Sequence, residues 1–428
     1  MMQLNRIDSP QIQIVKEITL PTIDKSNLSN GIPVFSINAG TQEVVKIQLV
    51  FKAGTWFQSQ ALEAFFTGQM LNEGSENYTA VEIAEKLDNY GAFVNKKINR
   101  DNACIDIFTL NKHLKSVLTL VADMIKNPLF SKTELNRLCD QEKQEFIVRN
   151  QKVTHIAQKQ FTALLFGNKH PYGASAKVED YNKITPSLLK NFHQNHYGSG
   201  NCKIFISGKI NDLTINLVNQ FFGQEQWGVD KTVPIPTFTA SSSSNLHHFT
   251  PKENVLQSAI RMGKRTIGRK HADYFSLSVV STLFGGYFGS RLMSNIREDK
   301  GYTYGIYAGV SPKLHDSSFT ISSEVGADVA QKALDEIRFE LKRLRTEKVK
   351  DEELSLVKNY MSGTFLRTLN GPFALGEVIK SLYEYNLPED FYQHYLNQIH
   401  KVSTDDVNTI ANKYLHEDEM IELVVGRK

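Results

Sequence analysis

Apolar and polar positions along the chain change period repeatedly, from the alternation of strands to the stripes of helices. Residues 44–51 alternate before ending in an unbroken apolar run, which predicts a strand buried on at least one face. Residues 79–90 carry one apolar stripe behind Thr79-Ala80-Val81-Glu82, the pattern of a capping box at a helix start. A second such pattern at residues 131–134 predicts the start of a long helix reaching about residue 152. The chain is therefore expected to be an α+β protein.

The predicted elements occur twice in the same order. The first series begins with a strand at residues 44–51, a helix at 60–71, a strand pair at 93–110 and an amphipathic helix at 112–126. It continues with a long helix at 134–152, a helix behind an N-cap from residue 185 onward and a closing strand at 202–207. The second series repeats it at residues 255–262, 274–283, 304–325, 327–345, 351 onward, 403 onward and 421–425. Self-similarity of this kind indicates two homologous halves. Because strands arrive in adjacent pairs and helices in runs, each half is predicted to be an antiparallel sheet with helices packed on one face.

Composition changes abruptly between the two series. Residues 226–246 contain Gly228, Pro234, Pro236 and four consecutive serines, which predicts a linker. The expected division is an N-terminal domain at residues 1–225 and a C-terminal domain at 247–428, and the length of 428 residues suits two domains. About 30 polar residues at the start are expected to form an extended arm.

Charge and cysteine usage narrow the possible partners. The 49 basic and 46 acidic residues nearly balance, so nothing points to nucleic acid or an anionic membrane. Three scattered cysteines do not form a disulfide framework. The sequence as given shows neither a secretory signal nor an apolar run of about 18 residues, so we expect a cytoplasmic protein that does not span a membrane.

Histidine placement restricts metal chemistry. The first histidine is His113, and no two histidines stand four residues apart, so a helical zinc site with two imidazoles one turn apart cannot be built. His193 and His196 stand three apart, followed by Tyr197 and Gly198, and are interpreted as the solvated end of a helix.

One stretch nevertheless resembles a zinc-site region. Residues 64–71, Ala-Phe-Phe-Thr-Gly-Gln-Met-Leu, follow a strand and turn and precede a short glycine loop and a second helix. This arrangement resembles the pitrilysin/insulinase family of metallopeptidases, whose helix carries His-x-x-Glu-His. The corresponding positions are Phe65, Gly68 and Gln69, so the ligands and the general base are missing. The resemblance also places Glu145, 76 residues after Gln69, where the family has its third ligand, and we interpret it as a relic, so that this chain binds no metal itself.

The second half carries a further resemblance to the same family. Residues 290–304 are similar to its Arg/Tyr segment, with Arg297 and Tyr304 seven apart and Gly301 between them. The resemblance implies that Tyr304 donates a hydrogen bond to a developing oxyanion and that Arg297 holds a substrate carbonyl. The alternative is a solvated helix-end arginine and a tyrosine packed in the core.

Two functional hypotheses follow from the resemblance. In the first, the chain is the zinc-less subunit of a heterodimeric metalloendopeptidase, is inactive alone, and lends Arg297 and Tyr304 to a homologous partner that holds Zn²⁺ and an extended peptide substrate. In the second, it is a non-catalytic peptide-binding or scaffold protein of the same fold, either alone or as a homodimer, and Arg297 and Tyr304 are buried away from any chamber. An intact peptidase with unconventional ligands is disfavoured because no cluster of histidines, cysteines and acids has workable spacing.

Overall fold

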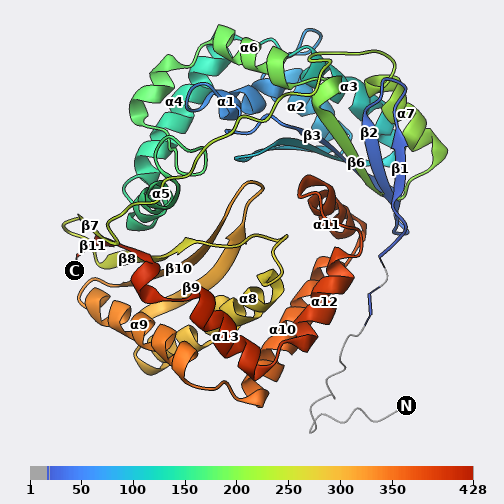
Figure 1. Ribbon diagram of the computed structural model, residues 1–428. Helices are drawn as coiled ribbons and strands as arrows, with labels where there is room; N and C mark the ends of the chain where they lie inside the picture. Colours follow the sequence, from blue (N-terminus) through green and yellow to red (C-terminus); the bar gives the residue numbers. More distant parts are fainter. Residues whose placement is uncertain (1–16, 19, 428) are drawn as a thin grey trace, which may run out of the picture.

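The first half of the chain forms a six-stranded sheet in the computed structural model, which describes residues 17–18 and 20–427 (Figure 1). Its strand order is β1-β2-β6-β3-β5-β4. The strands are β1 Asp24–Asn27, β2 Pro33–Asn38, β3 Val44–Phe51, β4 Phe93–Ile98, β5 Ala103–Leu110 and β6 Cys202–Gly208. The helices are α1 Glu63–Gln69, α2 Ala80–Asn89, α3 Leu114–Lys126, α4 Lys132–Arg149, α5 Val153–Phe166, α6 Pro186–His196 and α7 Asp212–Phe222.

The second half forms a five-stranded sheet in the order β7-β11-β8-β10-β9. Its strands are β7 His247–Pro251, β8 Gln257–Arg265, β9 Thr303–Pro312, β10 Ser317–Gly326 and β11 Ile421–Gly426. Its helices are α8 Tyr274–Ser281, α9 Ala330–Thr346, α10 Asp351–Thr368, α11 Pro372–Glu384, α12 Phe391–Lys401 and α13 Thr404–Tyr414. None of the helices in the described ranges combines the length and the apolar character needed to cross a bilayer.

The two sheets share one topology. The order β6-β3-β5-β4 in the first half corresponds to β11-β8-β10-β9 in the second, so the predicted duplication and α+β class are confirmed. The sheets are mixed and not purely antiparallel, because β2 pairs with β6 and β7 pairs with β11 in parallel. Each closing strand returns only after a run of helices, and it enters in parallel beside an early strand of its half, β2 for β6 and β7 for β11. Adjacency in sequence could not indicate that pairing.

One face of each sheet is covered by helices of its own half. In the first half, alternate residues of β3 and β5 pack against α3 and α7, and the cluster includes Ile47, Ile105 and Val121. In the second half, β8 and β10 pack against α8, α9 and α13. These two clusters are the main cores, and they follow from the period of two in the strands and 3.6 in the helices.

The other face of each sheet is partly covered by a helix from the opposite half. Helix α5 packs on β8 and β11, where Phe161 and Leu165 meet Ala259 and Leu423. Helix α11 packs on β2 and β6 of the first sheet, where Ile379 meets buried residues of the sheet. Figure 1 shows these helices at opposite sides of the space between the two sheets. The sequence predicted helices there but not the exchange.

A buried polar network joins α11 to the first sheet. The Gln48 side chain donates to Glu377 at 2.9 Å and to Asp106 at 2.7 Å, and Lys46 forms an ion pair with Glu377. Lys380 adds an ion pair to Glu377 at 2.6 Å. The hydrogen bonds and ion pairs with Lys380 and Lys46 hold the pKa of Glu377 below its ordinary value although burial opposes this. The network therefore ties the halves together through satisfied charges.

Local start signals were confirmed in part. Thr79 and Glu82 form the expected capping box, as do Ser403 and Asp406 in the second half. The predicted long helix does begin after Ser131, as α4. However, Ser131 makes no side-chain cap and Glu134 pairs with Arg137, so the capping box predicted there was wrong. Residues 1–16 and 19 of the expected N-terminal arm lie outside the described residues, whereas its later part is described and contains β1 from residue 24. Residues 230–246 contain no helix or strand, and they connect the two sheets.

Candidate functional site

Helix α1, which carries the positions of the missing zinc motif, is short and tightly anchored. The Glu63 carboxylate accepts hydrogen bonds from the Ser59 backbone N–H at 2.7 Å and from the Ser59 hydroxyl at 2.9 Å. Leu62 at its N-cap has a left-handed backbone with φ of 75°. The helix therefore begins at residue 63, three residues later than the pattern predicts, and a 3₁₀ turn at Met70–Asn72 continues it.

The space where a catalytic glutamate would stand is filled. Gly68 is buried, and a Cβ atom at this position would lie 2.2 Å from Cδ1 and 2.5 Å from Cγ1 of Ile98 on β4. It would also lie 3.4 Å from the hydroxyl of Tyr197, which is buried without a hydrogen-bond partner among the described residues. Phe65 is half-buried and packs edge-on against Phe66, with ring centroids 5.2 Å apart. The residues present do not fit a metal with an activating carboxylate.

A lysine closes the C-terminal end of this helix. Lys96 on β4 donates to the Gln69 carbonyl oxygen at 2.9 Å and also to the Asn72 side chain. Burial lowers the pKa of Lys96 to about 8, while the charge of Glu73 opposes the shift. The third motif position, Gln69, thus contributes its backbone carbonyl to a cation contact. The alternation of β4 contained no signal for this role.

The side chain of Glu145 faces solvent and does not pack between the helices. It is exposed on α4 and accepts a hydrogen bond from the Gln141 side chain at 3.3 Å, whereas its neighbour Phe146 is buried in the cluster that holds Phe66. The described residues contain no group of three or more histidine, cysteine, aspartate or glutamate side chains arranged to hold a metal ion.

Near the end of α6, His193 is buried and His196 is half-buried, which corrects the prediction of a solvated helix end. The His193 Nε2 atom lies 2.8 Å from the Ile125 carbonyl oxygen, and its ring stacks on Tyr197 with centroids 5.1 Å apart. Burial lowers the pKa of His193 to about 4 and that of His196 to about 4. His193 belongs to the packing behind α1, whereas the half-buried His196 packs on Phe192 with ring centroids 4.3 Å apart.

Arg297 and Tyr304 lie in a different environment. Arg297 is half-buried in a π-helical segment, Met293–Asp299, and its guanidinium carbon lies 4.3 Å from the centroid of the Phe288 ring. Gly301 then turns the chain with φ of +66°, in the left-handed region that favours glycine. Tyr304 at the start of the edge strand β9 is 91% exposed. The structure thus leaves the Tyr304 phenol open to a ligand or a partner.

The start of β9 is held by hydroxyl contacts. The Thr303 hydroxyl donates to the Glu324 carbonyl oxygen at 2.6 Å and accepts from the Gly305 N–H at 3.0 Å. These bonds fix the backbone on either side of Tyr304 while its ring remains exposed. A rigid backbone with an exposed side chain is suited to recognition, because little ordering is needed on binding.

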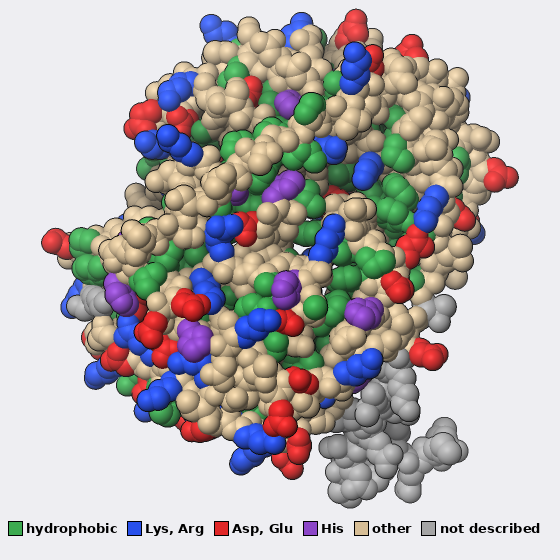
Figure 2. All heavy atoms as spheres, viewed as in Figure 1, with side chains coloured by type: hydrophobic (Ala, Val, Ile, Leu, Met, Phe, Trp, Pro, Cys, Tyr) green, Lys and Arg blue, Asp and Glu red, His purple; other side chains and the backbone are tan. Residues whose placement is uncertain are grey.

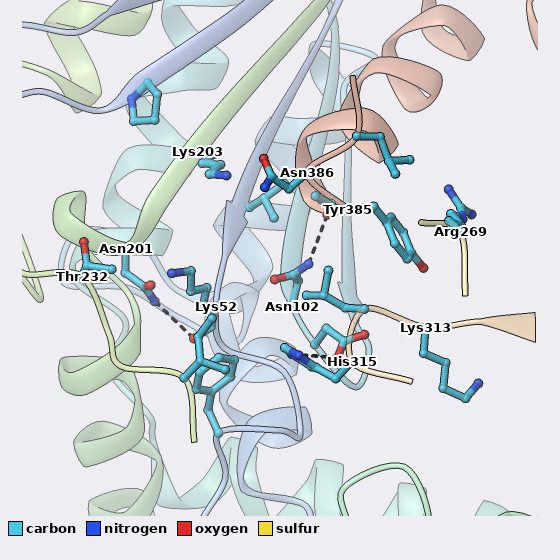
Figure 3. Close-up of a pocket in the computed structure, with 18 of the residues that line it drawn as sticks. Lys52, Asn102, Asn201, Lys203, Thr232, Arg269, Lys313, His315, Tyr385 and Asn386 are labelled. Atoms are coloured by element: carbon cyan, nitrogen blue, oxygen red, sulfur yellow. Dashed lines mark hydrogen bonds and ion pairs between the residues drawn. The ribbon is translucent and has the colours of Figure 1, made fainter. Parts of the chain in front are cut away.

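A large cavity that the sequence did not predict lies between the two halves (Figure 3). Its volume is about 890 Å³, and its walls come from segments far apart in the chain. Lys203 lies on β6 and Lys52 directly follows β3, whereas Arg269, Lys313 and Tyr385 belong to the second half. No short motif links these residues, so only the fold brings them together.

The fold, two homologous α+β halves with sheets of one topology, is that of a metallopeptidase-like protein. The profile described as "Insulinase (Peptidase family M16)" matches residues 33–175, and that described as "Peptidase M16 inactive domain" matches residues 183–361. The chain belongs to this family, which is also called the pitrilysin/insulinase family. The family resemblance inferred from the sequence is thereby confirmed.

Curated relatives cover nearly the whole chain. An uncharacterized zinc protease, YmxG, of Bacillus subtilis is 23% identical over 410 residues, which are 94% of this chain and 98% of the relative. A protein of Helicobacter pylori named "Non-peptidase homolog YmxG" is 23% identical over 397 residues, 89% of each chain.

Solved structures show the same fold. The peptidase M16 inactive domain from Pseudomonas fluorescens superposes with a TM-score of 0.84, is 23% identical, and the match covers 95% of this chain and 98% of that one. A protease from Helicobacter pylori gives a TM-score of 0.85 at 18% identity, with coverage of 95% and 100%.

Proposed function

We propose that this chain is the zinc-less subunit of a heterodimeric M16-family metalloendopeptidase. The observation that carries the proposal is the contrast between a filled helix site at Gly68 and an exposed Tyr304. A homologous partner with His-x-x-Glu-His would hold Zn²⁺ and activate water, and this chain would lend the Arg/Tyr pair. The peptide would lie extended along a sheet edge, as in other strand-addition complexes.

The Tyr304 phenol would donate a hydrogen bond to the oxyanion that develops on the scissile carbonyl. Such a donor acts most strongly where it is held in place and water is excluded. The Thr303 hydroxyl contacts supply the first condition, and docking of a partner over β9 would supply the second. Arg297, supported by the Phe288 ring, would hold a substrate carbonyl farther along the peptide.

The test is cleavage of an unstructured peptide by this chain co-expressed with a zinc-motif homologue. Removing one oxyanion donor typically lowers kcat by about 100- to 1000-fold. We therefore expect Tyr304→Phe to lower kcat of the pair by about 100-fold, with no loss of complex formation by gel filtration.

Tyr307→Phe is the matched control, because Tyr307 is also an exposed tyrosine of β9. Its variant is expected to retain full activity. Cleavage unaffected by Tyr304→Phe would remove the catalytic role, and cleavage by this chain alone would remove the division of labour between two subunits.

A non-catalytic peptide-binding or scaffold role is the second candidate, and the printed name of the Helicobacter pylori relative, a non-peptidase homologue, favours it. That role requires no zinc-bearing partner. Peptide binding by the isolated chain, with no cleavage in the presence of any zinc-motif homologue from the same genome, would support this candidate over the first.

A further inference from the structure

The cavity between the two halves has walls of different origin. Its first wall is the end of the first sheet, with Val50, Lys52 and Lys203, and its second wall comes from the loops after β8 and β9 and from the end of α11. A volume of about 890 Å³ lies in the range of pockets that bind small molecules or short peptides. In Figure 2, lysine and arginine side chains stand on both sides of the hollow between the halves.

Two lysines of the first wall lie on one sheet face. Lys203 of β6 pairs with Val50 of β3, and Asn201, two residues before Lys203, donates to the Lys52 carbonyl oxygen at 3.2 Å. Lys52 and Lys203 are therefore diagonal neighbours on one face of the sheet. The backbone positions of such neighbours in an antiparallel pair lie roughly 7–8 Å apart. Burial and the charge of Lys52 lower the pKa of Lys203. Within the described part of the chain neither lysine forms an ion pair.

The second wall adds cationic side chains with N–H groups that are free to donate hydrogen bonds. The Arg269 guanidinium stacks on the Tyr385 ring at 4.0 Å and donates through Nη1 to the Ser381 hydroxyl at 2.9 Å. Its Nε atom is buried and has no hydrogen-bond partner among the described residues. Lys313 lies over the Tyr172 ring at 5.6 Å, and burial lowers its pKa. Figure 3 shows Arg269 and Lys313 across the cavity from Lys52 and Lys203.

The acids of the cavity are mostly engaged elsewhere. Asp101 accepts from the Tyr172 hydroxyl at 2.8 Å, Asp316 pairs with Arg265 at 2.8 Å, and Glu384 accepts from Asn102 at 3.2 Å. The fourth, Asp230, is exposed. The charge of Glu384 acts on Lys203, but within the described residues neither lysine of the first wall forms an ion pair, so both can contact a ligand.

Apolar side chains share the same cavity. Phe57, Ile235 and Leu387 line it beside the cations. A small inorganic anion would leave these surfaces wet, whereas a ligand with both a negative group and an apolar body would contact all of them.

We propose that this cavity binds a carboxylate attached to an apolar body, such as the free C-terminus of a short peptide or an organic acid of similar size, with the carboxylate at Lys52 and Lys203. The apolar body would lie against Phe57, Ile235 and Leu387. The cavity and its cations belong to this chain alone, so the proposal does not depend on a zinc-bearing partner.

The experiment is isothermal titration calorimetry of the full chain with the peptide Ala-Ala-Phe-Leu and with its C-terminal amide. We expect the free acid to bind and the amide to bind at least about tenfold more weakly, because the amide lacks the charge that the two lysines meet. The double variant Lys52→Gln/Lys203→Gln is expected to lose at least about tenfold affinity for the acid and to bind the amide as the wild type does.

Lys209→Gln is the matched control, since Lys209 follows β6 directly but pairs with Glu43 outside the cavity. It should leave both affinities unchanged. Lys313→Gln provides a second variant on the opposite wall, and circular dichroism verifies the folding of each protein. A titration with octanoate then separates the sources of the carboxylate: binding of octanoate but not of the peptide identifies an organic acid, and binding of the peptide alone identifies a peptide end.

The proposal is overturned if the acid and the amide bind equally, if neither peptide nor octanoate binds, or if Lys209→Gln weakens binding as much as the double variant. Binding of inorganic phosphate in place of every carboxylate would also overturn it. None of these outcomes bears on peptide cleavage by a heterodimer, which is measured separately.

Discussion

Two regions that the proposed function assigns to catalytic centres, the helix α1 and the start of β9, are built in opposite ways here. Around α1 the interior is closed: Ile98 occupies the space beside Gly68, His193 stacks on Tyr197, and Lys96 satisfies the Gln69 carbonyl. At the start of β9, Tyr304 projects into solvent from a fixed backbone. Packing accounts for the first region. It does not account for Tyr304, since an exposed ring contributes little to the stability of the fold.

The largest expected effect comes from reopening the closed region. Phe65→His/Gly68→Glu/Gln69→His restores the residues of the motif, but the new carboxylate side chain at position 68 would have to displace Ile98 and face the buried Tyr197 hydroxyl. We expect the variant to lose roughly 3 kcal/mol of stability or more and to hold no stoichiometric zinc. Thermal unfolding and metal analysis measure the two effects.

Gly68→Ala isolates the steric part of that effect. Alone it is expected to cost about 1–3 kcal/mol, and combined with Ile98→Ala the loss should be smaller than the sum of the two single losses. Additive losses, or tight zinc binding by the triple variant, would show that the region is not closed by Ile98.

A smaller effect on stability is expected when the pH is lowered. The pKa of His193 is about 4 in the fold against an ordinary 6.5, so the folded state resists protonation and the unfolded state does not. The contribution of the neutral His193 side chain to the free energy of unfolding is therefore complete above pH 6.5, and it is lost as the pH falls toward 4. Between pH 7 and pH 5 we expect His193→Gln to reduce the fall in unfolding free energy by about 2 kcal/mol.

Urea unfolding at both pH values measures this difference. The exposed His271 offers a control, and His271→Gln should leave the pH dependence as it is in the wild type. An unchanged slope in His193→Gln would mean that the region behind α1 admits water.

The smallest expected effect is at the open region. Tyr304→Phe should change the free energy of unfolding by less than about 0.5 kcal/mol, because the side chain is almost fully exposed. Urea unfolding checks this in the same series. A loss of 2 kcal/mol or more would assign Tyr304 a structural role and weaken the contrast with α1.

The sequence predicted those parts of the fold that depend on local period. The strands at Val44–Phe51 and Ala103–Leu110 and the helix start at Thr79 follow from alternation and capping, and their repetition predicted the second sheet. The parallel pairing of β2 with β6 was not predictable, because it joins strands separated by a run of helices.

The candidate site was predictable only where residues are close in sequence. The missing motif at Phe65, Gly68 and Gln69 is a local observation, and so is the spacing of Arg297 and Tyr304. The contacts of Ile98 and Lys96 with α1, and the meeting of Lys52 with Arg269 across a cavity, depend on long-range packing. Likewise, nothing local distinguishes a solvated His193 from a buried one.

The exchange of α5 and α11 has a consequence for synthesis on the ribosome. The inner face of the first sheet receives its cover from residues 372–384, so that face stays wet until most of the polypeptide has emerged. Domains usually complete folding as they leave the tunnel, the earlier before the later. Here a nascent fragment ending at residue 225 would still expose Val50, Phe205 and the charges of Lys46 and Asp106. A chaperone bound to this surface would be released when residues 372–384 pack on the sheet.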